Sequence, residues 1–190
     1  MGNIAWWIES VWLVICLYWV ATALRVKPVV RRERPATRAL QIFLLTCFAV
    51  LMFTRWPLPA FFERQVVPHS VFSALTGLAI VILGAALAIA ARSHLGGNWS
   101  ANVTIKEGHE LIRTGPYALV RHPIYFGLVM AAVGTALAFG QMRNLIALPL
   151  LILAFRLKQL TEERFLLETF GDQYRAYQQT VRSAMIPFLL

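Results

Sequence analysis

The sequence VFSALTGLAIVILGAALAIAA, from Val71 to Ala91, decides the fold class of this chain. It holds no charged residue and has the length of about 20 apolar residues that a helix needs to cross the hydrocarbon core of a bilayer. Gly77, Gly84 and Ala88 give this helix a face of small side chains, on which a second helix can pack closely. We therefore predict a transmembrane helix here.

Four further apolar runs lie on either side of this stretch: Trp6 to Leu24, Ala39 to Phe53, Ile124 to Gly140 and Asn144 to Leu157. Counted along the chain, the second run, Ala39 to Phe53, and the fifth, Asn144 to Leu157, are short for a span, which needs roughly 17 apolar residues. Arg38, Arg55 and Arg156 complete them by extending their charged ends to the interface. The last two runs are separated by only a few residues, which predicts a helical hairpin.

The composition agrees with a membrane location. Of the 190 residues 58% are hydrophobic and 14% are charged, and the mean hydropathy is +0.62, so the apolar surface exceeds what one small soluble core can hide. We predict an all-α integral membrane protein with about five transmembrane helices, built as a single membrane domain over residues 1–190. Residues 1–91 hold the first three spans. Residues 92–190 hold a cytoplasmic loop, the helical hairpin and C-terminal helices, which together carry the candidate site.

The basic residues indicate both the partner and the orientation. The formal net charge is +9, but the basic residues flank the apolar runs instead of forming a separate arm, so lipid head groups are the predicted partners and nucleic acid is not. Most of the 18 Lys and Arg residues lie in residues 25–38, 92–121 and 156–190. Because cytoplasmic loops carry the excess of Lys and Arg, we predict that the N-terminus is outside and that the C-terminal half faces the cytoplasm.

The two cysteines, Cys16 and Cys47, each lie within an apolar run. They predict neither a disulfide framework nor a Cys-based metal site, and we assign no metal. The first run is not preceded by Lys or Arg, which argues against a secretory signal peptide, although Ala21-Thr22-Ala23 leaves that alternative open.

The segment before the fourth run concentrates polar and aromatic residues beside the membrane. A Gly-Pro pair predicts a turn that presents Tyr117 near the interface. Pro123 suits the first turn of a helix, which places His122 and Tyr125 at the cytoplasmic mouth of that helix. Peptide N–H groups at a helix start are free to bind an anionic group such as a carboxylate.

A second group of polar residues follows the fifth run. Lys158 and Glu162 are four residues apart, hence on one face of a helix, and Glu163 adds a second carboxylate. Such carboxylates suit a cationic cofactor, or they order a basic side chain that holds an anionic substrate. Taken singly, the residues of both groups also fit structural roles: interfacial tyrosines, a basic residue that marks the cytoplasmic side, and a solvated Lys–Glu pair.

Taken together, the ordered motifs Gly-Pro-Tyr, Arg-His-Pro-x-Tyr-x-Gly, Glu-Glu and Phe-Gly-x-x-Tyr resemble the isoprenylcysteine carboxyl methyltransferase family and its bacterial and phospholipid-methylating relatives. The resemblance runs from about Trp99 to Pro187. It implies that the cofactor is S-adenosylmethionine, held by His109, Glu110, Leu111, Ile112, Tyr117, His122, Pro123, Ile124 and Tyr125. It also implies Lys158 and Glu162 as candidate catalytic residues, because they fall where the family recognises the carboxyl end of the substrate. The eukaryotic members have Arg where Lys158 stands.

The predicted function is therefore an integral membrane methyltransferase that uses S-adenosylmethionine, with carboxyl O-methylation favoured, and acts on an amphiphilic or prenylated small molecule. A carboxylate acceptor is ionised at neutral pH and needs no general base, unlike an amine or a thiol. Alternatives of the same kind are a phospholipid N-methyltransferase and a small-thiol S-methyltransferase. Two further alternatives are an NADPH-dependent lipid reductase, since some sterol reductases are similar in this region, and a non-enzymatic transporter or scaffold.

Overall fold

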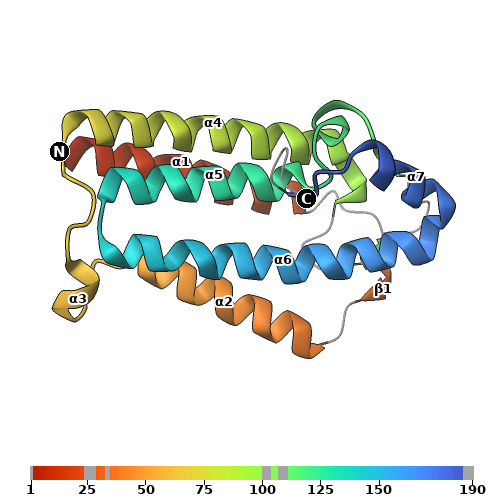
Figure 1. Ribbon diagram of the computed structural model, residues 1–190, viewed down its shortest axis with the longest axis horizontal. Coiled ribbons are helices and arrows are strands. Elements are labelled where there is room, and N and C mark those ends of the chain that lie inside the picture. Colours follow the sequence, from red (N-terminus) through yellow and green to blue (C-terminus); the bar gives the residue numbers. More distant parts are fainter. Residues whose placement is uncertain (1, 24–28, 33–34, 100–103, 107–110, 186–190) are drawn as a thin grey trace.

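The computed structural model describes residues 2–23, 29–32, 35–99, 104–106 and 111–185, and its secondary structure there is helical apart from one pair of short strands (Figure 1). The α-helices are α1 Gly2–Ala23, α2 Pro35–Phe53, α3 Ala60–Glu63, α4 Val71–Leu95, α5 Pro123–Phe139, α6 Met142–Phe170 and α7 Asp172–Thr180. The shorter elements are the 3-10 turns η1 Gly96–Asn98 and η2 Gly115–Ala118 and the strands β1 Val29–Arg32 and β2 Thr104–Lys106.

Four of these helices, α1, α2, α4 and α6, are long and apolar enough to cross a membrane. Helix α5 is apolar but has 17 residues. At 1.5 Å per residue it is about 25 Å long, a little less than a hydrocarbon core of about 30 Å. The prediction of an all-α, multi-pass membrane protein is confirmed, while the count of five spans stays a prediction that depends on α5.

Two predicted spans are longer than their apolar runs. Helix α2 begins at Pro35, because proline suits the first position of a helix. Helix α6 continues without a break from Met142 to Phe170. Lys158 and the residues after it therefore lie on the same helix as the fifth apolar run. Leu, Lys, Gln, Glu and Arg, which favour the helix, make up most of this extension.

Helices α4 and α5 pack backbone against backbone through glycines. A Cβ atom on Gly77 would lie 2.5 Å from the carbonyl oxygen of Gly134, and one on Gly84 would lie 2.5 Å from that of Gly127. The relation is reciprocal, since a Cβ on Gly127 or Gly134 would lie 2.6 Å from the facing carbonyl. Real Cβ contacts are essentially never shorter than 3.0 Å, so only glycine allows this approach. The face of small residues predicted on α4 is thus the surface that holds α5.

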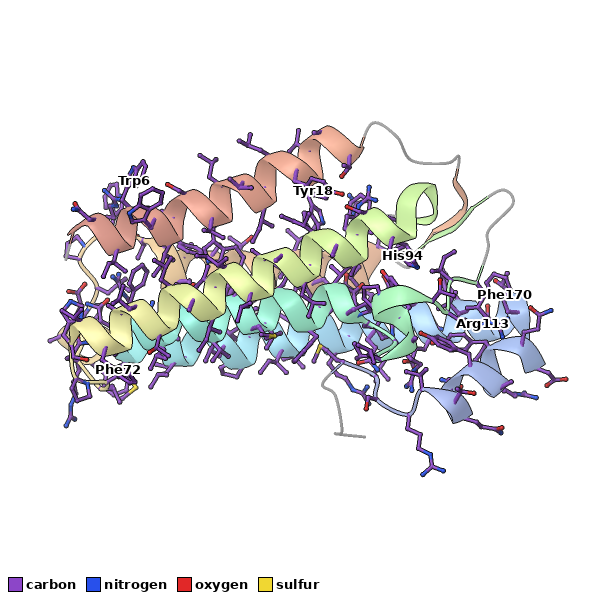
Figure 2. All side chains as sticks on the ribbon, turned by 90° about the horizontal axis from the view of Figure 1, so that it is seen from above. Trp6, Tyr18, Phe72, His94, Arg113 and Phe170 are labelled. Atoms are coloured by element: carbon purple, nitrogen blue, oxygen red, sulfur yellow. The ribbon has the colours of Figure 1, made fainter. Side chains whose placement is uncertain are left out.

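The bundle has two ends with different contents (Figure 1). Helix α1 lies along α4, and α6 runs back along α5 and packs against α2. The predicted hairpin of α5 and α6 is present, and its turn uses Gly140 in the left-handed conformation, with φ of 68°. We call the end that holds η2, α7 and the start of α5 the site end, and the end that holds α3 and the α5–α6 turn the distal end. Figure 2 shows Trp6 and Phe72 at the distal end and His94, Arg113 and Phe170 at the site end.

The sequence did not predict the two strands. β1 pairs with β2 in antiparallel orientation, with Val29 opposite Lys106 and Arg31 opposite Ile105. β-branched residues in both segments favour the extended conformation. This pair joins the segment after α1 to the segment between α4 and α5.

Candidate functional site

The candidate site is built around the start of α5, where Pro123 is the first helical residue and His122 is the N-cap. The backbone N–H groups of Arg121 and His122 donate to the carbonyl oxygens of Ser183 and Ala184, at 3.1 Å and 2.8 Å. The C-terminal segment after α7 is therefore bonded to the start of α5. This contact closes the site end of the bundle around the residues described below.

Glu163 is the centre of a network of hydrogen bonds. Its Oε1 atom accepts from Nε of Arg121 at 3.0 Å, from Nε2 of His122 at 3.1 Å and from Nε2 of Gln159 at 3.3 Å. The Nη2 atom of Arg121 lies 3.0 Å from the same oxygen, and Gln178 of α7 donates to Oε2 at 3.2 Å. We call Arg121, His122, Gln159, Glu163 and Gln178 the Glu163 network. It connects the start of α5 to α6 and α7.

Arg121 also fixes the C-terminal segment. Its Nη1 atom donates to the carbonyl oxygens of Val181 and Arg182, both at 2.7 Å. The side chain is only 9% exposed, so the guanidinium is almost fully used inside the protein. Arg121 is therefore part of the structure of the site end, and not only a basic residue that marks one side of the membrane.

Glu162 faces a different set of groups. Its Oε1 atom accepts from the Tyr125 hydroxyl at 2.7 Å, and its Oε2 atom lies 3.4 Å from Nδ1 of His122. The imidazole of His122 thus lies between two carboxylates, one at each ring nitrogen. Both nitrogens donate only when the ring is protonated. Burial opposes that charge, but the hydrogen bonds and charges of Glu162 and Glu163 outweigh it and raise the pKa of His122 above its ordinary value of 6.5.

An aromatic column supports Glu162. The rings of His122 and Tyr125 are parallel within 4° with centroids 5.4 Å apart, and Tyr125 stacks on Phe155 of α6 at 4.8 Å. The Nζ atom of Lys158 lies 5.7 Å from the centre of the Tyr125 ring, within the range of a cation–π contact. The structure thus brings together four of the residues singled out in the sequence: Lys158, Glu162, His122 and Tyr125.

The other predicted cofactor residues lie around this group. Pro123 and Ile124 are buried at the start of α5, and Ile124 belongs to the main core. Ile112 packs against that core, whereas Leu111 packs against a separate cluster formed by tyrosines of α7. His109 and Glu110 lie outside the described residues.

Tyr117 is buried and joins three parts of the site end. Its hydroxyl donates to the carbonyl oxygen of Ala91 at 3.4 Å, its own carbonyl oxygen accepts from the Tyr177 hydroxyl at 2.6 Å, and its ring stacks on that of His94. Burial is the main cause that raises the pKa of Tyr117 well above its ordinary value. The predicted turn at the Gly-Pro pair is present as η2, and Tyr117 in it is buried inside the protein.

Several N–H groups at the start of α5 already have partners. The sequence predicted free peptide N–H groups that could bind an anion. The Tyr125 and Phe126 N–H groups both donate to the carbonyl oxygen of His122, at 3.1 Å and 3.2 Å, and Pro123 has no N–H. These bonds use the donors of Tyr125 and Phe126, and the binding of an anion by N–H groups at this helix start stays a prediction.

Sequence reasoning also missed several residues of the site. The sequence named Glu163 as a second carboxylate but did not name its partner Gln159, although the two are four residues apart on one helix face, a signal that could have linked them. Phe155 precedes Gln159 by four residues and also belongs to this side of α6. Gln178 carried no such signal, because its contact with Glu163 depends on α7 folding back beside α6.

These features define a multi-pass helical membrane protein with a polar site at one end of its bundle. Residues 77–169 match the model of the Isoprenylcysteine carboxyl methyltransferase (ICMT) family. This stretch is therefore similar to that family, as the motifs indicated. It contains the glycine contacts of α4 and α5 and both Glu162 and Glu163.

Individual relatives agree with this assignment. The chain is 34% identical over 121 residues to a probable protein-S-isoprenylcysteine O-methyltransferase of Oryza sativa subsp. indica, which covers 62% of this chain and 63% of the rice protein. It is 33% identical over 113 residues to the protein-S-isoprenylcysteine O-methyltransferase of Schizosaccharomyces pombe, with 58% of this chain and 48% of the yeast protein covered. The chain thus spans less than two thirds of the length of these relatives.

A solved structure shows the same arrangement of helices. The chain is similar to the structure of the eukaryotic intramembrane Ras methyltransferase ICMT, with a TM-score of 0.51 and 28% sequence identity. The match covers 84% of this chain and 55% of that protein. This likeness covers more of the chain than the sequence matches do, so it extends to helices outside residues 77–169.

Proposed function

We propose that this chain is an integral membrane methyltransferase that uses S-adenosylmethionine to methylate the carboxylate of an amphiphilic, prenylated acceptor. The observation that carries the proposal is the coincidence of two regions. The stretch that matches the model of the ICMT family contains the start of α5 and the part of α6 in which His122, Tyr125, Lys158 and Glu162 come together.

The residues around Glu162 fit the chemistry of this cofactor. S-adenosylmethionine combines a sulfonium cation, a carboxylate and an adenine, and it supplies the methyl group. A carboxylate such as Glu162 and the face of an aromatic ring such as Tyr125 both attract a cation. Glu162 is 24% exposed, so its carboxylate is open to a ligand although Tyr125 and His122 hold it. Ile112 and Tyr117 supply apolar surface in the core that includes Tyr125, and Leu111 supplies it in the separate cluster of α7 tyrosines.

Lys158 is the residue we assign to the acceptor. It is half-buried on the face of α6 that carries Glu162, one turn away, next to the Tyr125 ring. An acceptor carboxylate is already ionised at neutral pH, so the protein has to hold and orient it and need not remove a proton. Lys158 binds it as a point charge, where the eukaryotic members of the family use the planar fork of Arg.

The membrane holds the prenyl part of the acceptor. Helices α1, α2, α4 and α6 are long and apolar enough to span a bilayer, and the site lies at one end of this bundle. A prenyl chain therefore stays in the bilayer while its polar end meets Lys158. We propose that the site end faces the cytoplasm, on the excess of Lys and Arg in the connections at that end. Cysteine labels at Trp56 and Gln179, which are both exposed, test this: an impermeant reagent added outside should reach only position 56 in a chain whose native cysteines are replaced.

The function is tested by methyl transfer from labelled S-adenosylmethionine to three acceptors: a prenylcysteine, a phosphatidylethanolamine and a small thiol. We expect methylation of the prenylcysteine and no methylation of its carboxamide, which lacks the ionised oxygen. Lys158→Ala should lower kcat/KM by roughly tenfold, the effect of losing one charge-assisted contact, with the Kd of the cofactor unchanged. Lys158→Arg should retain activity.

Two outcomes would contradict the proposal. If the phosphatidylethanolamine or the thiol takes up methyl while the prenylcysteine is inert, the acceptor class is wrong. If S-adenosylmethionine does not bind but reduced nicotinamide dinucleotide does, the chain is a reductase of the same membrane fold. Binding measured on the purified protein separates these two results.

A further inference from the structure

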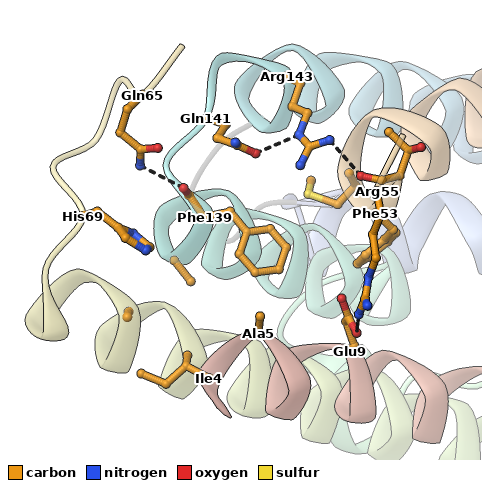
Figure 3. Close-up of a pocket in the computed structure, with 14 residues that line it drawn as sticks. Ile4, Ala5, Glu9, Phe53, Arg55, Gln65, His69, Phe139, Gln141 and Arg143 are labelled. Carbon is orange, nitrogen blue, oxygen red and sulfur yellow. Dashed lines mark hydrogen bonds and ion pairs between the residues drawn. The ribbon is translucent and has the colours of Figure 1, made fainter. Parts of the chain in front are cut away.

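A cavity of about 360 Å³ lies at the distal end, away from the candidate site (Figure 3). Its walls come from the start of α1, the end of α2, the start of α4 and the turn between α5 and α6. The proposed methyl transfer uses none of these residues. The cavity is therefore a separate feature of the bundle.

The polar side of the cavity presents a fixed cation. The guanidinium of Arg143 donates from Nε to the side chain of Gln141 and from Nη1 to the carbonyl oxygen of Thr54, both at 2.8 Å. These two bonds hold its plane, and within the described part of the chain no carboxylate pairs with it. Arg55, by contrast, is neutralised by Glu9 at 2.6 Å. The cavity thus has one guanidinium that no carboxylate of the described residues neutralises, and His69 lines the cavity beside Gln65.

Apolar side chains also line the cavity: Ile4, Ala5, Phe53 and Phe139. Figure 3 shows Ile4 and Ala5 on α1, across the cavity from Arg143, with the neutralised Glu9–Arg55 pair further along α1. A site with an oriented guanidinium and apolar side chains in its walls fits a molecule with an anionic head and a hydrocarbon chain.

The position of the cavity indicates where this molecule comes from. The exposed indoles of Trp6, Trp7 and Trp56 surround the distal end, and tryptophans of this kind mark the boundary between lipid and water. A cavity at that depth opens where phosphate groups of lipids lie. Arg is suited to such a phosphate, because its planar donors match two phosphate oxygens.

We propose that this cavity binds the phosphate head of an anionic membrane lipid, with Arg143 as the main contact and the first part of one acyl chain along Phe53 and Phe139. The site is independent of methyl transfer, since it lies at the other end of the helices. Arg143 binds the head, and the volume beside Ala5 admits the chain.

The probe is dioleoyl phosphatidic acid, with dioleoyl phosphatidylcholine as the neutral-charge comparison, added to the purified full-length protein in detergent. Bound lipids are counted by native mass spectrometry. The variants are Arg143→Gln, which removes the charge, and Ala5→Phe, which fills the apolar side without changing charge. Arg156→Gln is the matched control, because Arg156 is an exposed arginine on the same helix away from the cavity.

We expect one saturable phosphatidic acid per chain, bound more tightly than phosphatidylcholine. Arg143→Gln should weaken it by about tenfold, the size of one charge-assisted contact. Ala5→Phe should weaken it by a similar factor, because the added ring takes the space of the acyl chain, while Arg156→Gln has no effect. Equal losses in Arg156→Gln and Arg143→Gln would overturn the proposal, because binding would then depend only on surface charge. Equal binding of phosphatidylcholine would overturn it as well.

Two further results keep the test decisive. If Arg143→Gln does not fold, Ala5→Phe decides alone, and unchanged binding in that variant contradicts the site. Glycerol 3-phosphate, which has the head without the chains, is added as a competitor. Displacement of the lipid at similar concentrations would mean that the site takes a water-soluble phosphate, and the assignment to a membrane lipid would then be wrong.

Discussion

Glu162 and Glu163 are neighbours in α6, but they belong to two different regions of the molecule. Glu163 is 13% exposed and accepts from Arg121, His122, Gln159 and Gln178, so its oxygens are filled by the protein. Glu162 is 24% exposed and is held by the Tyr125 hydroxyl and, at a longer distance, by His122. We call the second region, formed by Glu162, Tyr125, Lys158 and Phe155, the Glu162 mouth.

The difference follows from helix geometry. Successive residues of an α-helix point about 100° apart, so two adjacent carboxylates face different neighbours. Glu163 points at the buried ends of α5 and α7, where it fixes the C-terminal segment. Glu162 points at the aromatic column, where a ligand can reach it. One carboxylate therefore positions the site, and the other is available for recognition.

The largest expected effect is on stability. Glu163→Ala leaves Arg121 and His122 buried without their shared carboxylate, which should lower the free energy of unfolding by about 3 kcal/mol. Glu162→Ala should cost less, about 1 kcal/mol, because it removes the partner of the Tyr125 hydroxyl at a more open position and leaves His122 with its second carboxylate, Glu163. Thermal unfolding of both variants in detergent checks this, with the exposed Gln173→Ala as control. Equal losses for Glu162→Ala and Glu163→Ala would contradict the division into two regions.

The sequence predicted the Glu162 mouth better than the Glu163 network. The spacing of Lys158 and Glu162 and the motif around His122 named the residues that meet at Glu162, because each lies near the start of a helix or on one helix face. The network depends on long-range folding: Gln178 reaches Glu163 only because α7 turns back. The helices were predictable from apolar runs, and the glycine face of α4 was predictable from small residues. The apolar run predicted that this helix ends at Leu157, because hydrophobicity alone does not detect a helix that continues as a more polar segment.

The next effect separates the two regions by ligand binding. Tyr125→Phe keeps the ring that stacks on Phe155 but removes the hydroxyl that donates to Glu162 at 2.7 Å. If Glu162 meets the cofactor, S-adenosylmethionine should bind roughly tenfold more weakly, the size expected for a lost hydrogen bond to a charged group. Gln178→Ala, which removes a donor from the Glu163 network, should leave the Kd nearly unchanged. Isothermal titration measures the Kd of both variants. If Gln178→Ala weakens the binding of S-adenosylmethionine and Tyr125→Phe leaves it unchanged, the assignment of the two regions is reversed.

The smallest expected effect concerns His122, the one side chain that joins the two regions. Burial lowers its pKa, while hydrogen bonds to Glu162 and Glu163 and the charges of both carboxylates raise it, and the net result lies above the ordinary value of 6.5. The protonated ring is therefore favoured by folding. Its contribution to stability is fully present below pH 6.5 and is lost as the pH rises through the raised pKa.

The Tm of the wild-type protein should therefore fall between about pH 6 and about pH 9 by more than that of His122→Gln, which has no titrating ring. Tyr117 and Tyr174 do not add to the difference, because burial raises the pKa of both phenols far above this range. Since both carboxylates hold the proton, Glu162→Gln and Glu163→Gln should each reduce the pH dependence, although they differ in their effect on overall stability. Parallel curves for wild type and His122→Gln would show that the imidazole does not hold its proton between the two carboxylates, and the two regions would then be joined by contact alone.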